Sequence, residues 1–240
     1  MGLFSSILHL RDVPRDRLIP ALDKVLRKAS FEPAGVVAVP AGGPYSIPDH
    51  NSAAAAGPCY IVSALKGHWI TIIEVREGPQ LPEIGRSLSL ELSCYTLTIM
   101  VHDDDLFFYN LYRDGKSLDG YNSCPQYFEE KRISESEVGE QRHDPEPFGE
   151  LLPPNQTMDE LRALLNRGWW SAHDAGRLDD DGVATDDDGY VFESERMTAF
   201  GTLLQLHGEQ GDYPYTAWGD SQEINWPTLQ MIRYGLKAAT

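Results

Sequence analysis

The first part of the chain shows apolar positions that alternate or recur with helical spacing. Residues 3–10 alternate loosely and predict a strand. A helix is expected next, with Asp16 as its N-cap. Its apolar positions fall on one helical face: Leu18, Leu22, Val25, Leu26 and Ala29. Gly35 to Val39 predicts a second strand, so the chain opens with a β-α-β unit.

A second unit of the same kind follows a long loop at residues 40–58. Cys59–Leu65 and His68–Val75 are predicted strands, and Lys66–Gly67 is the expected two-residue turn between them. A helix is predicted next, with Pro82 in its first turn. Its buried stripe comprises Leu81, Ile84, Leu88 and Leu92. The strand Cys94–Val101 completes the unit.

Tight turns divide the stretch after that strand. His102–Asp105 is expected to turn the chain into the strand Leu106–Tyr112. Arg113–Lys116 contains Asp-Gly and predicts a type I′ hairpin, because glycine accepts the positive φ that this turn requires. Asp119–Gly120 predicts another turn. Both faces of Leu106–Tyr112 are apolar or aromatic, so helices cover them or one aromatic face is open for binding.

The last part of the chain predicts helices. Thr157 and Glu160 form a capping box before one apolar stripe. Ser194 is expected to cap a second helix. Asn225 is the expected cap of a third helix, whose inner positions are Leu229, Ile232 and Leu236.

These elements predict an α+β protein with a mixed, largely antiparallel sheet and helices packed on it. The two β-α-β units are ferredoxin-like in layout with extra strands, a comparison of topology alone. We expect a sheet domain over residues 1–128 and a linker or surface wrap over 129–156. The acidic, mainly helical region 157–240 forms a small subdomain or docks on the sheet.

The charge is unevenly distributed. The chain has 240 residues and a net charge of −17. Residues 1–128 carry 14 acidic and 11 basic side chains, whereas residues 129–240 carry 23 acidic and 9 basic ones. Such a chain repels nucleic acids and anionic membranes, so we expect neither as a partner. A basic protein or a cation is the partner that the charge favours, and a solvated acidic surface is the alternative explanation.

The cysteine content and the hydropathy pattern predict a cytoplasmic protein. Three cysteines at scattered positions are no disulfide framework and no zinc knuckle. No apolar run approaches the length that crosses a bilayer, and the first residues lack the pattern of a signal peptide. The sequence also contains no phosphate-binding loop, nucleophile elbow or zinc-binding HExxH helix.

The acidic stretch Asp179–Glu195 is the candidate metal site. With Gly189 at the sixth position of a 12-residue calcium loop, Asp186 and Asp188 become ligands, Tyr190 offers its carbonyl, and Glu195 closes the loop. Ala184 stands where such loops carry their first aspartate, and the helix that should enter the loop is short. Calcium is therefore the candidate cofactor, and a solvated Asp-Gly turn is the alternative.

Two further groups are candidates for catalysis. His102 lies beside Asp103, Asp104 and Asp105, and a histidine near carboxylates can act as a general base. Cys124 is a candidate nucleophile. The alternative is that the aspartates shape a hairpin turn and that Cys124 only lies where the chain is pinned to the sheet.

The function remains open at this level. The absence of catalytic signatures, the acidity and the aromatic strand favour a non-catalytic binding protein of immunity or regulatory type. The alternatives are an enzyme of unassigned class that uses His102 with Asp103 and Asp105, or Cys124, and a calcium-stabilised module.

Overall fold

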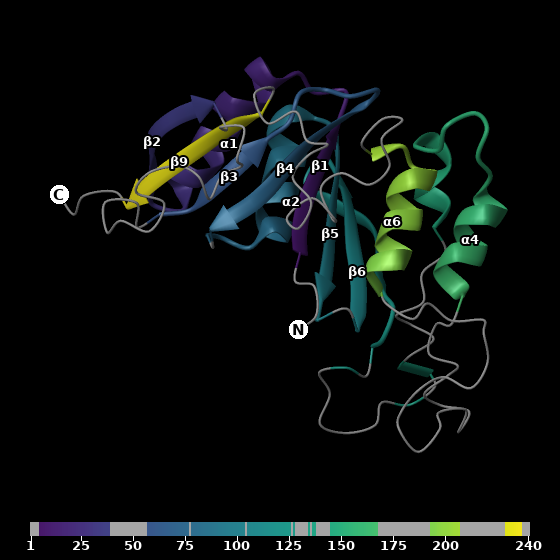
Figure 1. The fold of residues 1–240 in the computed structure, drawn as a ribbon. Coiled ribbons are helices and arrows are strands. Elements are labelled where there is room, and N and C mark those ends of the chain that lie inside the picture. Colours follow the sequence, from purple (N-terminus) through teal and green to yellow (C-terminus); the bar gives the residue numbers. More distant parts are fainter. Residues whose placement is uncertain are drawn as a thin grey trace.

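A computed structural model describes the fold of residues 5–38, 57–76, 78–103, 105–125, 127, 134, 136–137, 145–167, 193–206 and 229–236 (Figure 1). An eight-stranded sheet forms its centre, with the strand order β2-β9-β3-β4-β1-β5-β6-β7. The strands are β1 (Ser5–Arg11), β2 (Phe31–Ala38), β3 (Cys59–Val62), β4 (Trp69–Arg76), β5 (Tyr95–His102), β6 (Leu106–Arg113), β7 (Lys116–Asn122) and β9 (Gln230–Leu236).

All strand pairings among the described residues are antiparallel. The predicted α+β class is therefore confirmed, but the described sheet is antiparallel and not mixed as predicted. Helix α2 (Leu81–Leu92) connects β4 to β5, and β1 lies between these two strands and pairs with both.

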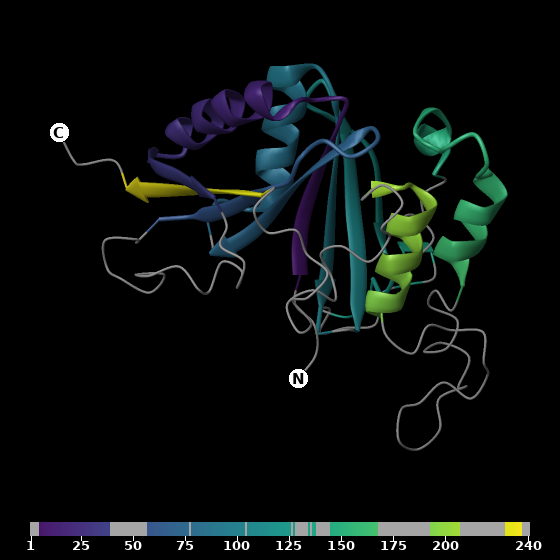
Figure 2. The same ribbon diagram turned by 45° about the horizontal axis from the view of Figure 1, so that its top comes forward.

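Helices α1 (Arg15–Lys28) and α2 lie on one face of the sheet (Figure 2). Alternation places Leu8 and Leu10 of β1 and Ile70 and Ile72 of β4 on this face, where they pack against both helices. Leu22 of α1 is fully buried in the same cluster. The apolar stripes predicted for both helices therefore form the core on this side, except for Ala29, which is exposed at the C-cap of α1.

The opposite face carries η3 (Glu146–Glu150), α4 (Met158–Asn166) and α6 (Glu193–Leu203) over β5, β6 and β7. In both ribbon views α6 lies between β6 and α4 (Figures 1 and 2). The core here is aromatic: Tyr109 stacks on Phe200 at 5.1 Å and on Tyr121 at 5.7 Å, measured between ring centroids. The aromatic face that was a candidate binding surface is covered by α6 and η3.

Several local predictions are confirmed. Thr157 and Glu160 form the capping box at the start of α4. Asp114 and Gly115, with φ of 50° and 75°, form the turn between β6 and β7. Two hydrogen bonds join this turn to helix α2: the Arg86 side chain donates to the Gly115 carbonyl, and the Gly115 N–H donates to the Ser89 hydroxyl.

The predicted third C-terminal helix is wrong in its described part, because residues 230–236 form strand β9. The alternation of apolar side chains fits a strand: Ile232 and Tyr234 pack on the face of the sheet that carries α1, and Met231 packs on the opposite face. The Tyr234 hydroxyl donates to Asp23 of α1 at 2.7 Å and thereby ties the strand to this helix.

Two smaller predictions are also wrong. Asp119–Gly120 is not a turn but part of β7, because the buried Asp119 carboxylate accepts a hydrogen bond from Tyr109 at 2.7 Å. The N-cap of α1 is Pro14, so Asp16 lies in the first turn, where its charge still favours the helix.

The long loop at 40–58 lies largely outside the described residues, and so does the first part of the predicted linker, from 129 to 144. The last part of that linker, residues 145–156, is described: it contains η3, and Phe148 and Leu151 are buried in the core. In the described part of the chain, no helix has the length and apolarity needed to span a membrane.

Candidate functional site

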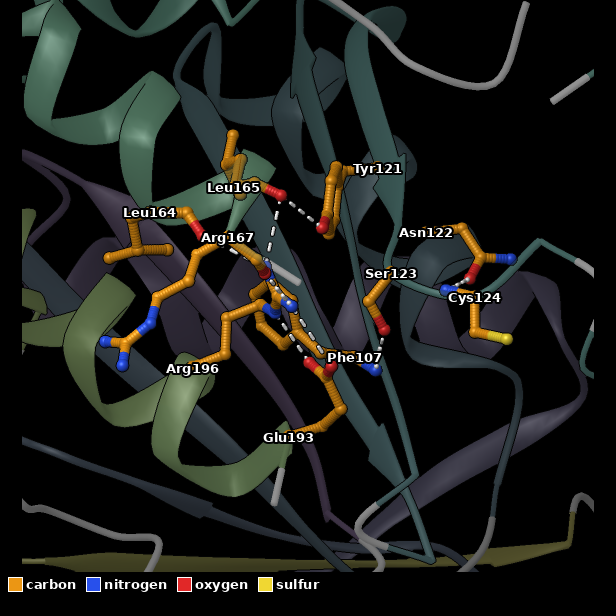
Figure 3. Close-up of polar contacts among 10 residues, drawn as sticks. All are labelled: Phe107, Tyr121, Asn122, Ser123, Cys124, Leu164, Leu165, Arg167, Glu193 and Arg196. Carbon is orange, nitrogen blue, oxygen red and sulfur yellow. Dashed lines mark hydrogen bonds and ion pairs between the residues drawn. The ribbon is translucent and has the colours of Figure 1, made fainter. Parts of the chain in front are cut away.

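A buried polar cluster surrounds Arg196 of α6, a residue that is only 1% exposed (Figure 3). Its five N–H donors meet five acceptor atoms. Two bonds go to the Glu193 carboxylate, at 2.7 and 3.2 Å. Three go to backbone carbonyls at the end of α4, those of Leu164, Leu165 and Arg167, at 2.9, 3.1 and 2.7 Å. All the hydrogen-bonding capacity of this arginine is therefore used inside the protein.

Arg196 completes the C-terminus of α4 from another helix. The last carbonyls of a helix have no partner within it, and α4 has no basic residue in its last turn. The positive guanidinium also interacts favourably with the negative end of the helix dipole. Arg196 is thus the cap that α4 does not contain.

Glu193 neutralises Arg196 from the same helix, three residues earlier. Burial raises the pKa of the Glu193 carboxyl, and this effect outweighs the opposing effects of Arg196 and of a hydrogen bond from Ser123. The Ser123 hydroxyl also accepts a bond from the Phe107 N–H at 2.9 Å. The cluster therefore links α6 to the end of β7 and the start of β6.

Tyr121 of β7 links the sheet to α4 directly. Its hydroxyl donates to the Leu165 carbonyl at 2.6 Å, and its ring lies 5.9 Å from the Arg196 guanidinium. The cluster around Arg196 was not foreseen in the sequence. The only available signal is a Glu–Arg pair three residues apart beside the apolar positions Met197 and Phe200.

The predicted catalytic group at His102 lies where β5 turns into β6. The strands pair up to His102 and Leu106, so the expected hairpin is present. Asp103 is exposed and has a φ of 54°, a left-handed conformation that aspartate tolerates in turns. Asp105 is also exposed. Asp104 lies outside the described residues.

Tyr127 joins this hairpin to the segment that carries Cys124. Its ring and the His102 ring meet in a T-shaped arrangement with 5.8 Å between their centroids. Its hydroxyl donates to the Asp105 carboxylate at 3.2 Å. Its N–H donates to the Cys124 carbonyl at 3.0 Å. The pKa of Tyr127 is raised by desolvation and by the carboxylate and thiol groups around it, Cys124 included. The structure thus brings the two candidate catalytic groups to one end of the sheet.

This arrangement gives the two groups a common neighbour, and their catalytic role stays a prediction. The Cys124 N–H donates to the Asn122 side chain at 3.0 Å, a local turn that holds this segment beyond β7. Asp105 also lies close enough to Glu193 to contribute to the raised pKa of that carboxyl.

The candidate calcium ligands Asp186, Asp188 and Tyr190 lie outside the described residues. Glu195 is exposed in the first turn of α6. Within the described part of the chain, no group of three or more histidine, cysteine, aspartate or glutamate side chains is placed to hold a metal ion.

Comparison with known proteins adds no relative. No protein-family model matches the chain, and neither a curated protein nor a solved structure is significantly similar to it.

Proposed function

We propose that this chain is a non-catalytic binding protein of immunity or regulatory type, and that its partner is a basic protein. The observation that carries the proposal is the charge of the outer layer. Residues 145–166, which include η3 and α4, contain four carboxylates and one arginine. Asp159, Glu150 and Glu146 have side-chain exposures of 94%, 74% and 66%. Exposed charge of one sign accelerates association with a partner of opposite sign.

Nearby arginines offset part of this negative charge and leave the carboxylates in excess. Arg162 forms ion pairs with Glu146 and Asp159, and Arg113 of β6 pairs with Glu150, so four carboxylates face two arginines. Arg196 is buried and neutralised by Glu193. Because the aromatic side of β6 is filled by α6 and η3, we assign partner binding to the outer acidic surface instead of the sheet.

Affinity capture tests this proposal. The chain is immobilised and offered a cell extract at about 50 mM and about 300 mM salt, since surface attraction is screened over roughly 10 Å at 0.1 M. We expect basic proteins at low salt that are lost at high salt, and one of them should bind again after purification. Capture of no basic protein, or binding that salt leaves unchanged, contradicts the proposal.

Two further assignments belong to this proposal. We propose a ferredoxin-like arrangement for β1, α1, β3, β4, α2 and β5, supported by β1 lying between β4 and β5. We also propose a cytoplasmic location, supported by three cysteines that are all free thiols. Cell fractionation tests the location: recovery in an extracytoplasmic fraction contradicts it.

A further inference from the structure

The position of α4 sets it apart from the other helices. It packs on α6 and η3, and α6 in turn packs on β5 and β6 (Figures 1 and 2). With nine residues, α4 is too short to remain helical alone in water. Its helical state therefore depends on its contacts with the layer below.

Two kinds of contact hold α4 to the layer below: buried leucines and hydrogen bonds to its C-terminal carbonyls. Leu161, Leu164 and Leu165 are buried in the core cluster that also contains residues of α6. The C-terminal carbonyls accept bonds from Arg196 and Tyr121, both outside α4. The capping box at the N-terminus is internal to α4 and its cap residue, so it reforms whenever the helix forms.

The carboxylate that neutralises Arg196, that of Glu193, stays beside it when α4 detaches. Glu193 belongs to α6 and lies three residues before Arg196, and it holds the guanidinium through two bonds. Release of α4 therefore frees three carbonyl acceptors but leaves no unpaired buried charge. A buried ion pair that loses one charged member is costly, and this route avoids that cost.

We propose that α4 is a detachable strap, which opens and closes as a local unit while α6 and the sheet stay folded. Local opening of this kind draws on elements with few buried contacts and short length. Opening exposes the three buried leucines of α4 and the α6 surface beneath them, so it provides an apolar surface beside the acidic one. The inference is independent of the proposed function.

Native-state hydrogen exchange of the full chain tests the strap. The amides of α4 are expected to exchange faster than the slowest amides of β5 and β6, with little dependence on low urea concentrations. Equal exchange rates and equal urea dependence in α4 and in these strands overturn the proposal, because α4 then opens only when the whole fold does.

A pair of hydroxyl deletions sharpens the test. Tyr121→Phe removes the bond to the Leu165 carbonyl, and we expect exchange in α4 to rise about two- to tenfold while β5 and β6 keep their rates. Tyr109→Phe is the control, since its hydroxyl bonds Asp119 within the sheet. An increase after Tyr121→Phe that is as large in β5 and β6 as in α4 also overturns the proposal.

Discussion

Replacement of Arg196 by methionine is the most informative perturbation of this fold. Methionine keeps much of the side-chain length but removes all five donors. Three carbonyls at the end of α4 then lose their bonds from the guanidinium, although the Leu165 carbonyl keeps its bond from Tyr121. The buried Glu193 carboxylate loses its counter-charge. Removal of one member of a buried ion pair costs about 3–5 kcal/mol. Since domains are stable by about 5–15 kcal/mol, the variant should lose a large part of its stability.

Urea and thermal unfolding measure this loss. At about 2–4 °C per kcal/mol for a chain of this size, Tm should fall by about 6–20 °C. Arg196→Lys keeps the charge but has only three donors, so it should lie between methionine and the wild type. Arg162→Met is the matched control, because this half-buried arginine forms surface ion pairs that contribute at most about 1 kcal/mol.

A loss below about 1 kcal/mol for Arg196→Met, equal to that of the control, refutes the reasoning.

The pH dependence of unfolding gives an independent check through Glu193. Because its pKa is raised in the folded state above the usual 4.5, the stability it contributes is present at low pH and is lost as pH rises through the raised value. The wild type should therefore lose stability relative to Glu193→Gln between pH 4.5 and the raised pKa, and a constant difference contradicts the assignment.

Three further predictions concern other parts of the chain. Gly115→Ala should cost about 1–2 kcal/mol in urea unfolding, because φ is 75° and a Cβ would lie 3.1 Å from Leu90; Gly149→Ala, with open space, should be near neutral. Tyr109→Phe leaves the Asp119 carboxylate without this donor and should cost about 1.5–3 kcal/mol; an unchanged midpoint contradicts the bond. Calcium at about 1 mM should raise Tm relative to a chelator if the predicted loop binds it, and an unchanged Tm removes that function.

The turns and amphipathic helices of this fold could be predicted from sequence because their causes are local. The Asp114–Gly115 turn needs positive φ at both residues, and the Thr157–Glu160 capping box depends on four consecutive residues. The stripe of α2 follows from spacing alone. Each of these signals lies within a few residues of the structure it specifies.

Strand β9 and the core of β7 could not be predicted in the same way. Leu229, Ile232 and Leu236 fit helical spacing, while Ile232 and Tyr234 fit alternation, and the pairing of β9 with β2 and β3 decides between them. Asp119 resembles a turn residue until Tyr109 supplies its hydrogen bond across the strand pair.

The cluster around Arg196 was missed for a related reason. Three of its five acceptor atoms are carbonyls at the C-terminal end of α4 and its cap residue, about 30 residues away in sequence. Sequence spacing cannot show which helix end a guanidinium will meet. The joint position of Cys124 and His102 beside Tyr127 is likewise a product of tertiary structure.

The affinity of two matched variants for the basic partner tests the central claim most directly. Glu146→Gln with Asp159→Asn neutralises two carboxylates of the outer layer, whereas Asp16→Asn with Glu83→Gln neutralises two exposed ones on the α1 and α2 side. The net charge changes equally in both. The account predicts that the first variant binds at least about tenfold more weakly, with a smaller salt dependence, and that the second binds like the wild type. Equal affinity of the two variants would contradict it.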